Sequence, residues 1–148
     1  KLYIESRKNK SGKVLITSSL AGLLPIPFLG SYCSTKSALI TMATCLKKEI
    51  KKTNLDIKIK LIEPGAYKTG FNQIMIESNN ILDGEMFNQS LESISKTIED
   101  KFSLVEKKNI SRIVNKMYKA IESNSNKLVY RSPFIQVLGA KVYMMFFK

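Results

Sequence analysis

The sequence predicts an α/β fold built around a parallel sheet, and three neighbouring segments carry that prediction. Residues 14–17 form a short, continuous apolar run, typical of a strand that is buried on both faces. A helical segment extends from residue 31 to about residue 52, and residues 56–62 then have the pattern of a second strand. A strand, a long helix and another strand in about fifty residues make a βαβ unit, which implies parallel strands joined by a right-handed crossover.

The predicted helix is apolar on more than one side. Ser31 has a side chain typical of an N-cap, and one stripe at helical spacing consists of Leu39, Ala43, Leu46 and Ile50. Other apolar residues flank this stripe in the first half of the helix, so we expect the sheet to cover one side and a partner subunit another. The sequence therefore predicts a homo-oligomer. In the second strand Lys58 and Lys60 alternate with apolar residues, which predicts a face nearer to solvent.

The C-terminal half has weaker patterns. Residues 66 to about 108 contain enough spaced apolar residues for one or two amphipathic helices, and form either a lid over a substrate site or a structural insertion. Ser111 is positioned to cap the next helix, and residues 127–130 resemble a third short strand. The tail, residues 133–148, is aromatic, rich in methionine and short for a bilayer span. It is expected either to pack against the domain or a partner subunit, or to contact a membrane interface.

Composition excludes several classes of function. The net charge is +12, but the lysines are spread along the chain, so we expect a solvated basic surface and no nucleic-acid partner. The chain has no histidine, which excludes Ser-His-Asp and Cys-His catalysis and leaves few ligands for a metal, so no metal site is expected. Cys33 and Cys45 are twelve residues apart on one predicted helix, and a separation of about 18 Å is too long for a disulfide. A reducing, cytoplasmic location is therefore expected.

Membrane-spanning and secretory segments are not expected. Residues 14–35 carry no charge, but Pro25 and Pro27 interrupt them, so a strand followed by a loop fits better than a spanning helix. Residues 1–13 are polar and lack the apolar core of a signal peptide.

Three side chains form a candidate site for proton transfer. Tyr32 and Lys36 are four residues apart at the start of the predicted helix, so they project from the same face. A neighbouring ammonium group favours phenolate and lowers the pKa of a tyrosine from its usual value near 10, which suits general acid–base chemistry. Ser19 follows the first strand and could orient a carbonyl or alcohol oxygen. This set suits carbonyl reduction or alcohol oxidation, in which a cofactor supplies the hydride.

Residues 12–71 resemble the short-chain dehydrogenase/reductase family. Ser19 lies thirteen residues before Tyr32, which is the usual spacing of the family's serine and tyrosine, and Tyr32 with Lys36 matches its Tyr-x-x-x-Lys pair. Residues 64–69, Pro-Gly-Ala-Tyr-Lys-Thr, resemble the family's Pro-Gly-x-Val-x-Thr motif beside the nicotinamide, with tyrosine in place of valine. Several motifs in register make the resemblance specific.

The resemblance implies a Rossmann-like, doubly wound parallel sheet, NAD or NADP as cofactor, and a role for each matching residue. Tyr32 would exchange the proton with the substrate oxygen, Lys36 would bind the nicotinamide ribose and lower the pKa of Tyr32, and Ser19 would position the substrate. The implied cofactor-binding residues are Tyr32, Lys36, Pro64, Gly65, Tyr67 (through its backbone) and Thr69. Residues 70–108 would form the substrate loop.

The amino-acid sequence of residues 62–69, together with Tyr32-Cys33, looks most like the branch of the family that acts on steroids and retinol. The implied substrate is a small, apolar secondary alcohol or its ketone, or an aldehyde.

The family's glycine-rich phosphate loop is missing, because none of the seven glycines forms Gly-x-x-x-Gly-x-Gly or Gly-x-Gly-x-x-Gly. Residues 1–148 are therefore expected to form one partial NAD(P)-binding domain, the C-terminal half with about three strands, with residues 133–148 as its hydrophobic tail. The predicted function is NAD(P)-dependent oxidoreduction. The alternative is a truncated, inactive family member that acts as an interaction or membrane-surface protein.

Overall fold

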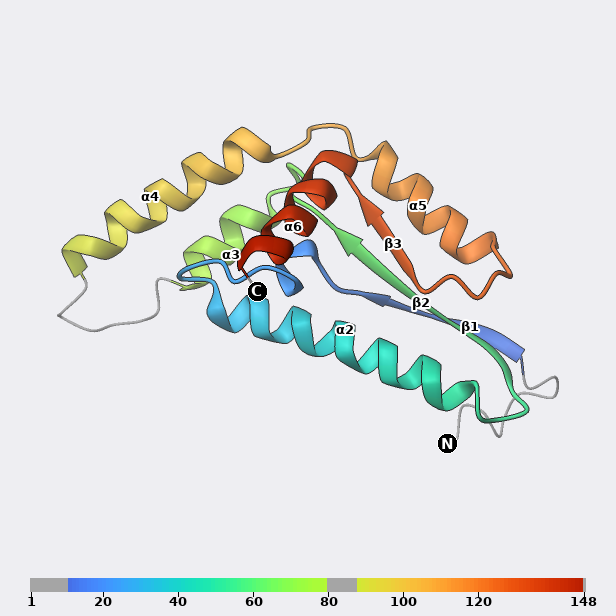
Figure 1. The fold of residues 1–148 in the computed structure, drawn as a ribbon. Coiled ribbons are helices and arrows are strands. Elements are labelled where there is room, and N and C mark those ends of the chain that lie inside the picture. The colour runs from blue at the N-terminus through green and yellow to red at the C-terminus, as the bar shows by residue number, and fades with distance from the viewer. Residues whose placement is uncertain (1–10, 80–87, 148) are drawn as a thin grey trace.

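The computed structural model describes residues 11–79 and 88–147 (Figure 1). Part of the predicted substrate-loop region, residues 80–87, lies outside the described residues. The elements in chain order are β1 (Ser11–Thr17), the short 3-10 helix η1 (Leu20–Gly22), α2 (Gly30–Ile50), β2 (Asp56–Pro64), α3 (Phe71–Asn79), α4 (Asn88–Val105), α5 (Ser111–Glu122), β3 (Val129–Ser132) and α6 (Phe134–Phe147).

The three strands form one parallel sheet in the order β1-β2-β3, which confirms the predicted fold class. Ser11 pairs with Asp56 and Thr17 with Ile62, so the carboxyl ends of β1 and β2 lie at the same edge of the sheet. The third strand was predicted two residues too early. The Leu128 carbonyl accepts a hydrogen bond from the Leu61 N–H, but the strand begins only at the next residue.

Helices cover both faces of the sheet, as a doubly wound fold requires. On one face Ala43 of α2 packs against Ile59 and Leu61. On the other face α5 packs against a cluster that contains Ile62 and Tyr130. In Figure 1, α2 and α5 lie on opposite sides of the three strands.

The prediction that the lysines of β2 mark a face nearer to solvent is wrong for Lys60, which is fully buried. Its Nζ donates hydrogen bonds to the carbonyl of Ser125 at 2.6 Å, and to the carbonyl of Lys127 and the Tyr130 hydroxyl at 3.4 Å each. These oxygens replace the water that the ammonium group loses on burial, so a lysine is accommodated in the core.

The two predicted serine caps are also wrong by one or two residues. Leu29 occupies the N-cap of α2 and Ile110 that of α5, and neither helix has a side-chain cap. Leu29 is buried with Cys33 and Met75, so packing rather than a hydroxyl holds the start of α2. At α5 the Asn109 Oδ1 accepts a hydrogen bond from the N–H of Ser111 at 2.8 Å.

Within residues 11–79 and 88–147, the outer side of α2 is left uncovered. Ala38, Met42 and Cys45 are exposed there, which agrees with the predicted second covering by a partner. A homo-oligomer stays a prediction.

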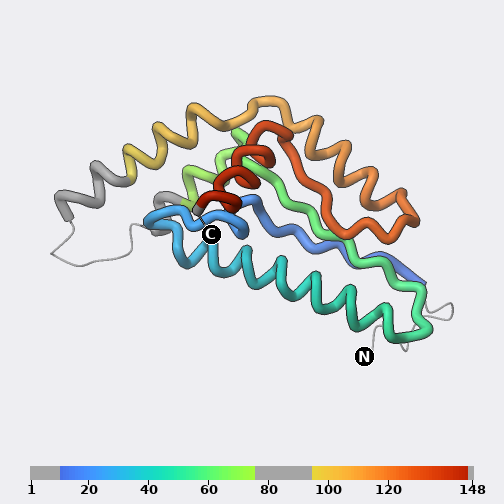
Figure 2. The backbone as a smooth tube through the Cα atoms, viewed as in Figure 1, coloured from blue at the N-terminus to red at the C-terminus, as the bar shows by residue number. Residues whose placement is uncertain are grey.

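The last helix returns across the carboxyl end of the sheet. The tube in Figure 2 shows the chain leaving β3 and continuing as α6 toward α3. Ala140 on the inner side of α6 is buried, so the tail packs against the domain along one face. None of the helices in the described part of the chain is long and apolar enough to cross a membrane.

Candidate active site

A cavity of about 670 Å³ lies at the carboxyl ends of β1 and β2. Its size is in the range that holds small ligands and cofactors. The residues that follow β1, the end of β2 and the start of α2 all contribute to its wall. The wall includes every predicted site residue, namely Ser19, Tyr32, Lys36, Pro64, Gly65, Tyr67 and Thr69.

The structure brings Ser19 and Tyr32 to the same cavity wall, where the Ser19 side chain is close enough to the phenol to lower the pKa of Tyr32. The Ser19 Oγ also accepts a hydrogen bond from the N–H of Ala21 at 3.1 Å, because Ser19 is the N-cap of η1. The same Oγ lies 3.4 Å from the Pro64 carbonyl oxygen. Ser19 therefore connects the end of β1, the end of β2 and the start of α2.

The Lys36 ammonium group lies over the Tyr32 ring, with its Nζ 5.5 Å from the ring centroid. Burial raises the pKa of Tyr32 above its ordinary value, the hydrogen bond from Ser19 lowers it, and the nearby Cys33 raises it, so the net shift is upward. The net shift is opposite to the lowering expected from Lys36, because desolvation of the half-buried phenol is the largest cause and favours its neutral form.

Two residues that sequence reasoning did not single out hold the serine loop against α2. The Ser18 Oγ donates a hydrogen bond to the Lys36 carbonyl at 2.7 Å, and Ser18 is buried. A Cβ added to Gly22 would lie 2.8 Å from the Lys36 carbonyl carbon and 2.8 Å from Ile40 Cδ1. Only a residue without a side chain allows this approach of loop and helix. Adjacent Ser18 and Ser19 thus make different contacts, one with backbone and one with Tyr32.

A third residue that the sequence analysis missed is Gln136 on α6, which borders the cavity. Its side chain accepts a hydrogen bond from the N–H of Ala66 at 2.7 Å and donates one to the carbonyl of Val105 at 2.8 Å. A Cβ on Gly65 would lie 2.0 Å from the Gln136 Oε1, so the Pro64-Gly65 turn leaves room for this side chain. No local motif predicts this contact, since Gln136 is seventy residues beyond the turn.

Tyr67 and Thr69 occupy different environments. The Tyr67 side chain is buried in the core beside Ile113, and its hydroxyl donates a hydrogen bond to the Ser132 Oγ at 2.9 Å. The Tyr67 carbonyl lies 3.4 Å from the Asn72 Nδ2, while Thr69 is exposed at the edge of the cavity. The departure from valine at position 67 is thus accommodated by the core, in which the tyrosine side chain is buried.

The remaining wall of the cavity is largely apolar. Helices α3, α4 and α5 and the loop after η1 supply it, with Leu24, Ile26, Phe71, Met75, Phe102, Val105, Ile110, Ile113, Val114 and Met117. Phe71 also lies beside Tyr32, with ring centroids 6.0 Å apart. The predicted substrate-loop region therefore lines the site. Among the described residues there is no group of three or more acidic or cysteine side chains that could hold a metal ion.

The sequence also matches a model of a known protein family. The family is described as short chain dehydrogenase, and the match covers residues 2–80, more than half of the 148 residues. The chain belongs to the short chain dehydrogenase family.

Individual relatives in this family match over shorter stretches. Mouse estradiol 17-beta-dehydrogenase 2 is 28% identical over 102 residues, which is 69% of this chain and 25% of that protein. Pig dehydrogenase/reductase SDR family member 4 is 37% identical over 71 residues, 48% of this chain and 25% of that protein. The matched stretches thus span a quarter of these relatives.

The fold is similar to the crystal structure of a short chain dehydrogenase/reductase from Burkholderia phymatum in complex with NAD. The TM-score is 0.69 at 15% sequence identity, and the alignment covers 93% of this chain and 48% of that one. A similarity at this identity supports the Rossmann-like fold of the family, and this chain corresponds to about half of it.

Proposed function

We propose that this chain is the catalytic and substrate-binding part of an NAD(P)-dependent oxidoreductase that interconverts a secondary alcohol and a ketone, or an aldehyde. The observation that carries the proposal is that Ser19, Tyr32 and Lys36 lie together on the wall of one cavity. Lys36 lies one helical turn away over the same tyrosine.

Each of the three side chains has a distinct task. The Ser19 hydroxyl positions the substrate oxygen next to the Tyr32 hydroxyl. Tyr32 donates its proton to that oxygen in reduction and accepts it in oxidation, and the raised pKa of Tyr32 keeps it protonated and ready for reduction at neutral pH. Lys36, whose ammonium group lies over the Tyr32 ring, binds the nicotinamide ribose beside the tyrosine.

The residues present fit the nicotinamide end of the cofactor. Tyr32, Lys36, Pro64, Gly65 and Thr69, with the backbone of Tyr67, would hold the nicotinamide and its ribose at the carboxyl edge of the sheet, where ligands of such sheets bind. NAD or NADP supplies the hydride when bound. The chain has no glycine-rich phosphate loop, so we propose that the cofactor phosphates are held by residues outside it.

The substrate is proposed to be a small apolar molecule. Apart from Ser19 and Tyr32, the substrate-facing wall is mainly aliphatic and aromatic, so an apolar body would be desolvated there at little cost. The mouse relative is named for estradiol, a largely apolar molecule, which agrees with such a substrate class. Two free cysteines, Cys33 and Cys45, fit a cytoplasmic location.

Substitution of Tyr32 by phenylalanine in the whole natural gene product tests the proposal. Tyr32→Phe should lower turnover about 10²- to 10⁴-fold while nicotinamide cofactor still binds, because the ring is kept and only the proton donor is lost. Turnover can be followed by nicotinamide absorbance and cofactor binding by calorimetry. Unchanged turnover would remove Tyr32 from the mechanism. If the whole natural gene product binds no nicotinamide cofactor, that result would instead support an inactive protein that acts in interactions or at a membrane surface.

A further inference from the structure

Helix α6 has an inner face and an outer face of different character. Gln136 and Ala140 on its inner side border the cavity. Its outer side exposes six large apolar side chains, with exposed fractions from 45% to 72%, namely Phe134, Ile135, Leu138, Val142, Met145 and Phe146. At 3.6 residues per turn these six fall within about one third of the helix circumference. We call this set the α6 apolar face.

The end of α4 and the connection to α5 expose further apolar side chains near the start of α6. The hydrogen bond from the Gln136 side chain to the Val105 carbonyl, at 2.8 Å, holds the first turn of α6 beside the end of α4. Leu104 is 84% exposed there, and Ile110 is also exposed. Exposed large apolar residues thus lie on two neighbouring elements at one edge of the domain.

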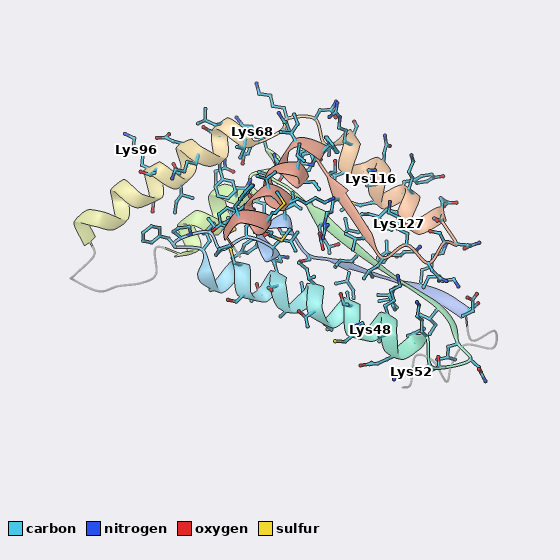
Figure 3. All side chains as sticks on the ribbon, in the orientation of Figure 1. Lys48, Lys52, Lys68, Lys96, Lys116 and Lys127 are labelled. Atoms are coloured by element: carbon cyan, nitrogen blue, oxygen red, sulfur yellow. The ribbon has the colours of Figure 1, made fainter. Side chains whose placement is uncertain are left out.

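Positive charge surrounds this edge. Lys107 and Lys108 lie in the chain between Leu104 of α4 and Ile110 of the connection, and Lys141 is exposed on α6. Lys68 is close to Lys107, because its N–H donates to the Lys107 carbonyl at 3.1 Å, and Figure 3 shows Lys68 near the end of α4.

Acidic groups are scarce at the same edge. Residues 134–147 include no acidic side chain, and residues 104–110 include only Glu106. The Glu106 Oε1 accepts a hydrogen bond from the Asn72 Nδ2 at 2.6 Å, so this carboxylate is directed toward α3. Glu99 and Asp100 are exposed on α4 about one turn before Leu104, and Lys68, Lys107, Lys108 and Lys141 outnumber the acidic groups of this edge.

We propose that the α6 apolar face and the adjacent lysines form a docking surface for a lipid bilayer that contains anionic headgroups. Helices with large apolar side chains on one side and lysines at their borders bind in the plane of such interfaces. The fourteen residues of α6 span about 21 Å, which is shorter than a bilayer core, so the helix would lie along the surface. The proposal concerns a binding surface and does not depend on the reaction assigned to the cavity.

Sedimentation with lipid vesicles tests this surface, using the natural gene product that contains residues 1–148. One vesicle preparation contains phosphatidylcholine alone and the other contains equal parts of phosphatidylcholine and phosphatidylserine. We expect the protein to sediment with the anionic vesicles and to be released by high salt. Phe134→Ser and Phe146→Ser should each weaken binding about tenfold, because each removes a large apolar side chain from the lipid contact.

Charge and surface controls are available in the same chain. Lys107→Glu and Lys108→Glu should each weaken binding at least about fivefold. Lys48→Glu and Lys52→Glu change exposed lysines at the far end of α2 (Figure 3) and should have little effect. Tyr118→Ser removes an exposed aromatic side chain on α5 (63% exposed) and should also leave binding unchanged.

Three outcomes would overturn the proposal. The first is a protein that does not sediment with anionic vesicles. The second is binding that the α6 substitutions and the α5 control weaken equally, which would indicate non-specific adsorption. The third is self-association, measured by light scattering, that Phe134→Ser and Phe146→Ser abolish in a protein that binds no lipid. That result would assign the α6 apolar face to a second copy of the chain.

Discussion

Gln136 on α6 binds both backbone polar groups of Ala66, the residue that follows the Pro64-Gly65 turn. The Gln136 Oε1 accepts from the Ala66 N–H at 2.7 Å, and its Nε2 lies 3.4 Å from the Ala66 carbonyl oxygen. The same Nε2 donates to Val105 at the end of α4. One side chain therefore connects the proposed nicotinamide turn, the substrate-loop region and the C-terminal helix.

Replacement of Gln136 by leucine should loosen this turn. We expect Gln136→Leu to lower the free energy of unfolding by about 2 kcal/mol, because it removes hydrogen bonds and leaves backbone groups without partners. It should also raise the KM for the nicotinamide cofactor more than it lowers kcat at saturating cofactor. Thermal unfolding and steady-state kinetics measure the two effects. Gln73→Leu, at an exposed position of α3, is the matched control. An equal loss of kcat and cofactor affinity would argue for a general structural role.

Gly22 should be far less tolerant of a side chain than Gly30. Gly22→Ala would place a Cβ 2.8 Å from the Lys36 backbone and force the Ser19 loop away from α2, at a cost of about 1–3 kcal/mol. Because this shift separates Ser19 from Tyr32, turnover should fall as well. Gly30→Ala meets nothing within 4 Å, so it should be neutral or stabilise by about 0.5–1 kcal/mol. Chemical denaturation and turnover of both variants test this. Equal effects at the two glycines would contradict the close approach.

Substitutions of the adjacent Ser18 and Ser19 should have different effects, one mainly on stability and the other mainly on turnover. Ser18→Ala removes the donor to the Lys36 carbonyl and should lower stability by about 1–3 kcal/mol, with a modest effect on turnover. Ser19→Ala should lower turnover about 10²-fold or more, because a group that orients the reacting oxygen is lost. Denaturation and kinetics on the two variants check the split. The reverse pattern would reassign the two hydroxyls.

The raised pKa of Tyr32 predicts opposite pH dependences for the two directions of the proposed reaction. Oxidation needs the deprotonated tyrosine, so its rate should rise with pH through the alkaline range toward and above about 10, the ordinary value for tyrosine. Reduction needs the protonated form and should be maintained at neutral pH and fall only in that same alkaline range. Rates in both directions, measured with substrate and cofactor at low concentration, provide the test. An oxidation rate that is already constant at pH values below about 8 would show that the tyrosine pKa is lowered in the working enzyme.

The parallel sheet and the residues of the proposed site could be predicted from local patterns. The apolar run before Ser19, the long helix and the alternating strand form a βαβ unit, and the structure has this unit with the expected strand direction. The Ser19, Tyr32 and Lys36 spacing was sufficient to place three side chains at one cavity, because parallel strands end at the same edge of a sheet. These features depend on periodicity and spacing within about fifty residues of the chain.

Other features depend on contacts between distant segments and had no local signal. Lys60 follows the alternating pattern that is typical of an exposed residue. It is nevertheless buried, because carbonyl groups about seventy residues further along the chain accept hydrogen bonds from its ammonium group. The pKa of Tyr32 follows from how much of the ring is covered, which no Tyr-Lys spacing determines.

The same distinction applies to the proton-transfer site and its surroundings. Sequence spacing was enough to identify Ser19, Tyr32 and Lys36 as candidates, since residue type and helical period place their side chains. Their environment, including the Gln136 contact with Ala66 and the apolar face of α6, arises when segments far apart in sequence exclude water from one another. That exclusion is a property of the folded chain as a whole, and therefore appears only in the tertiary structure.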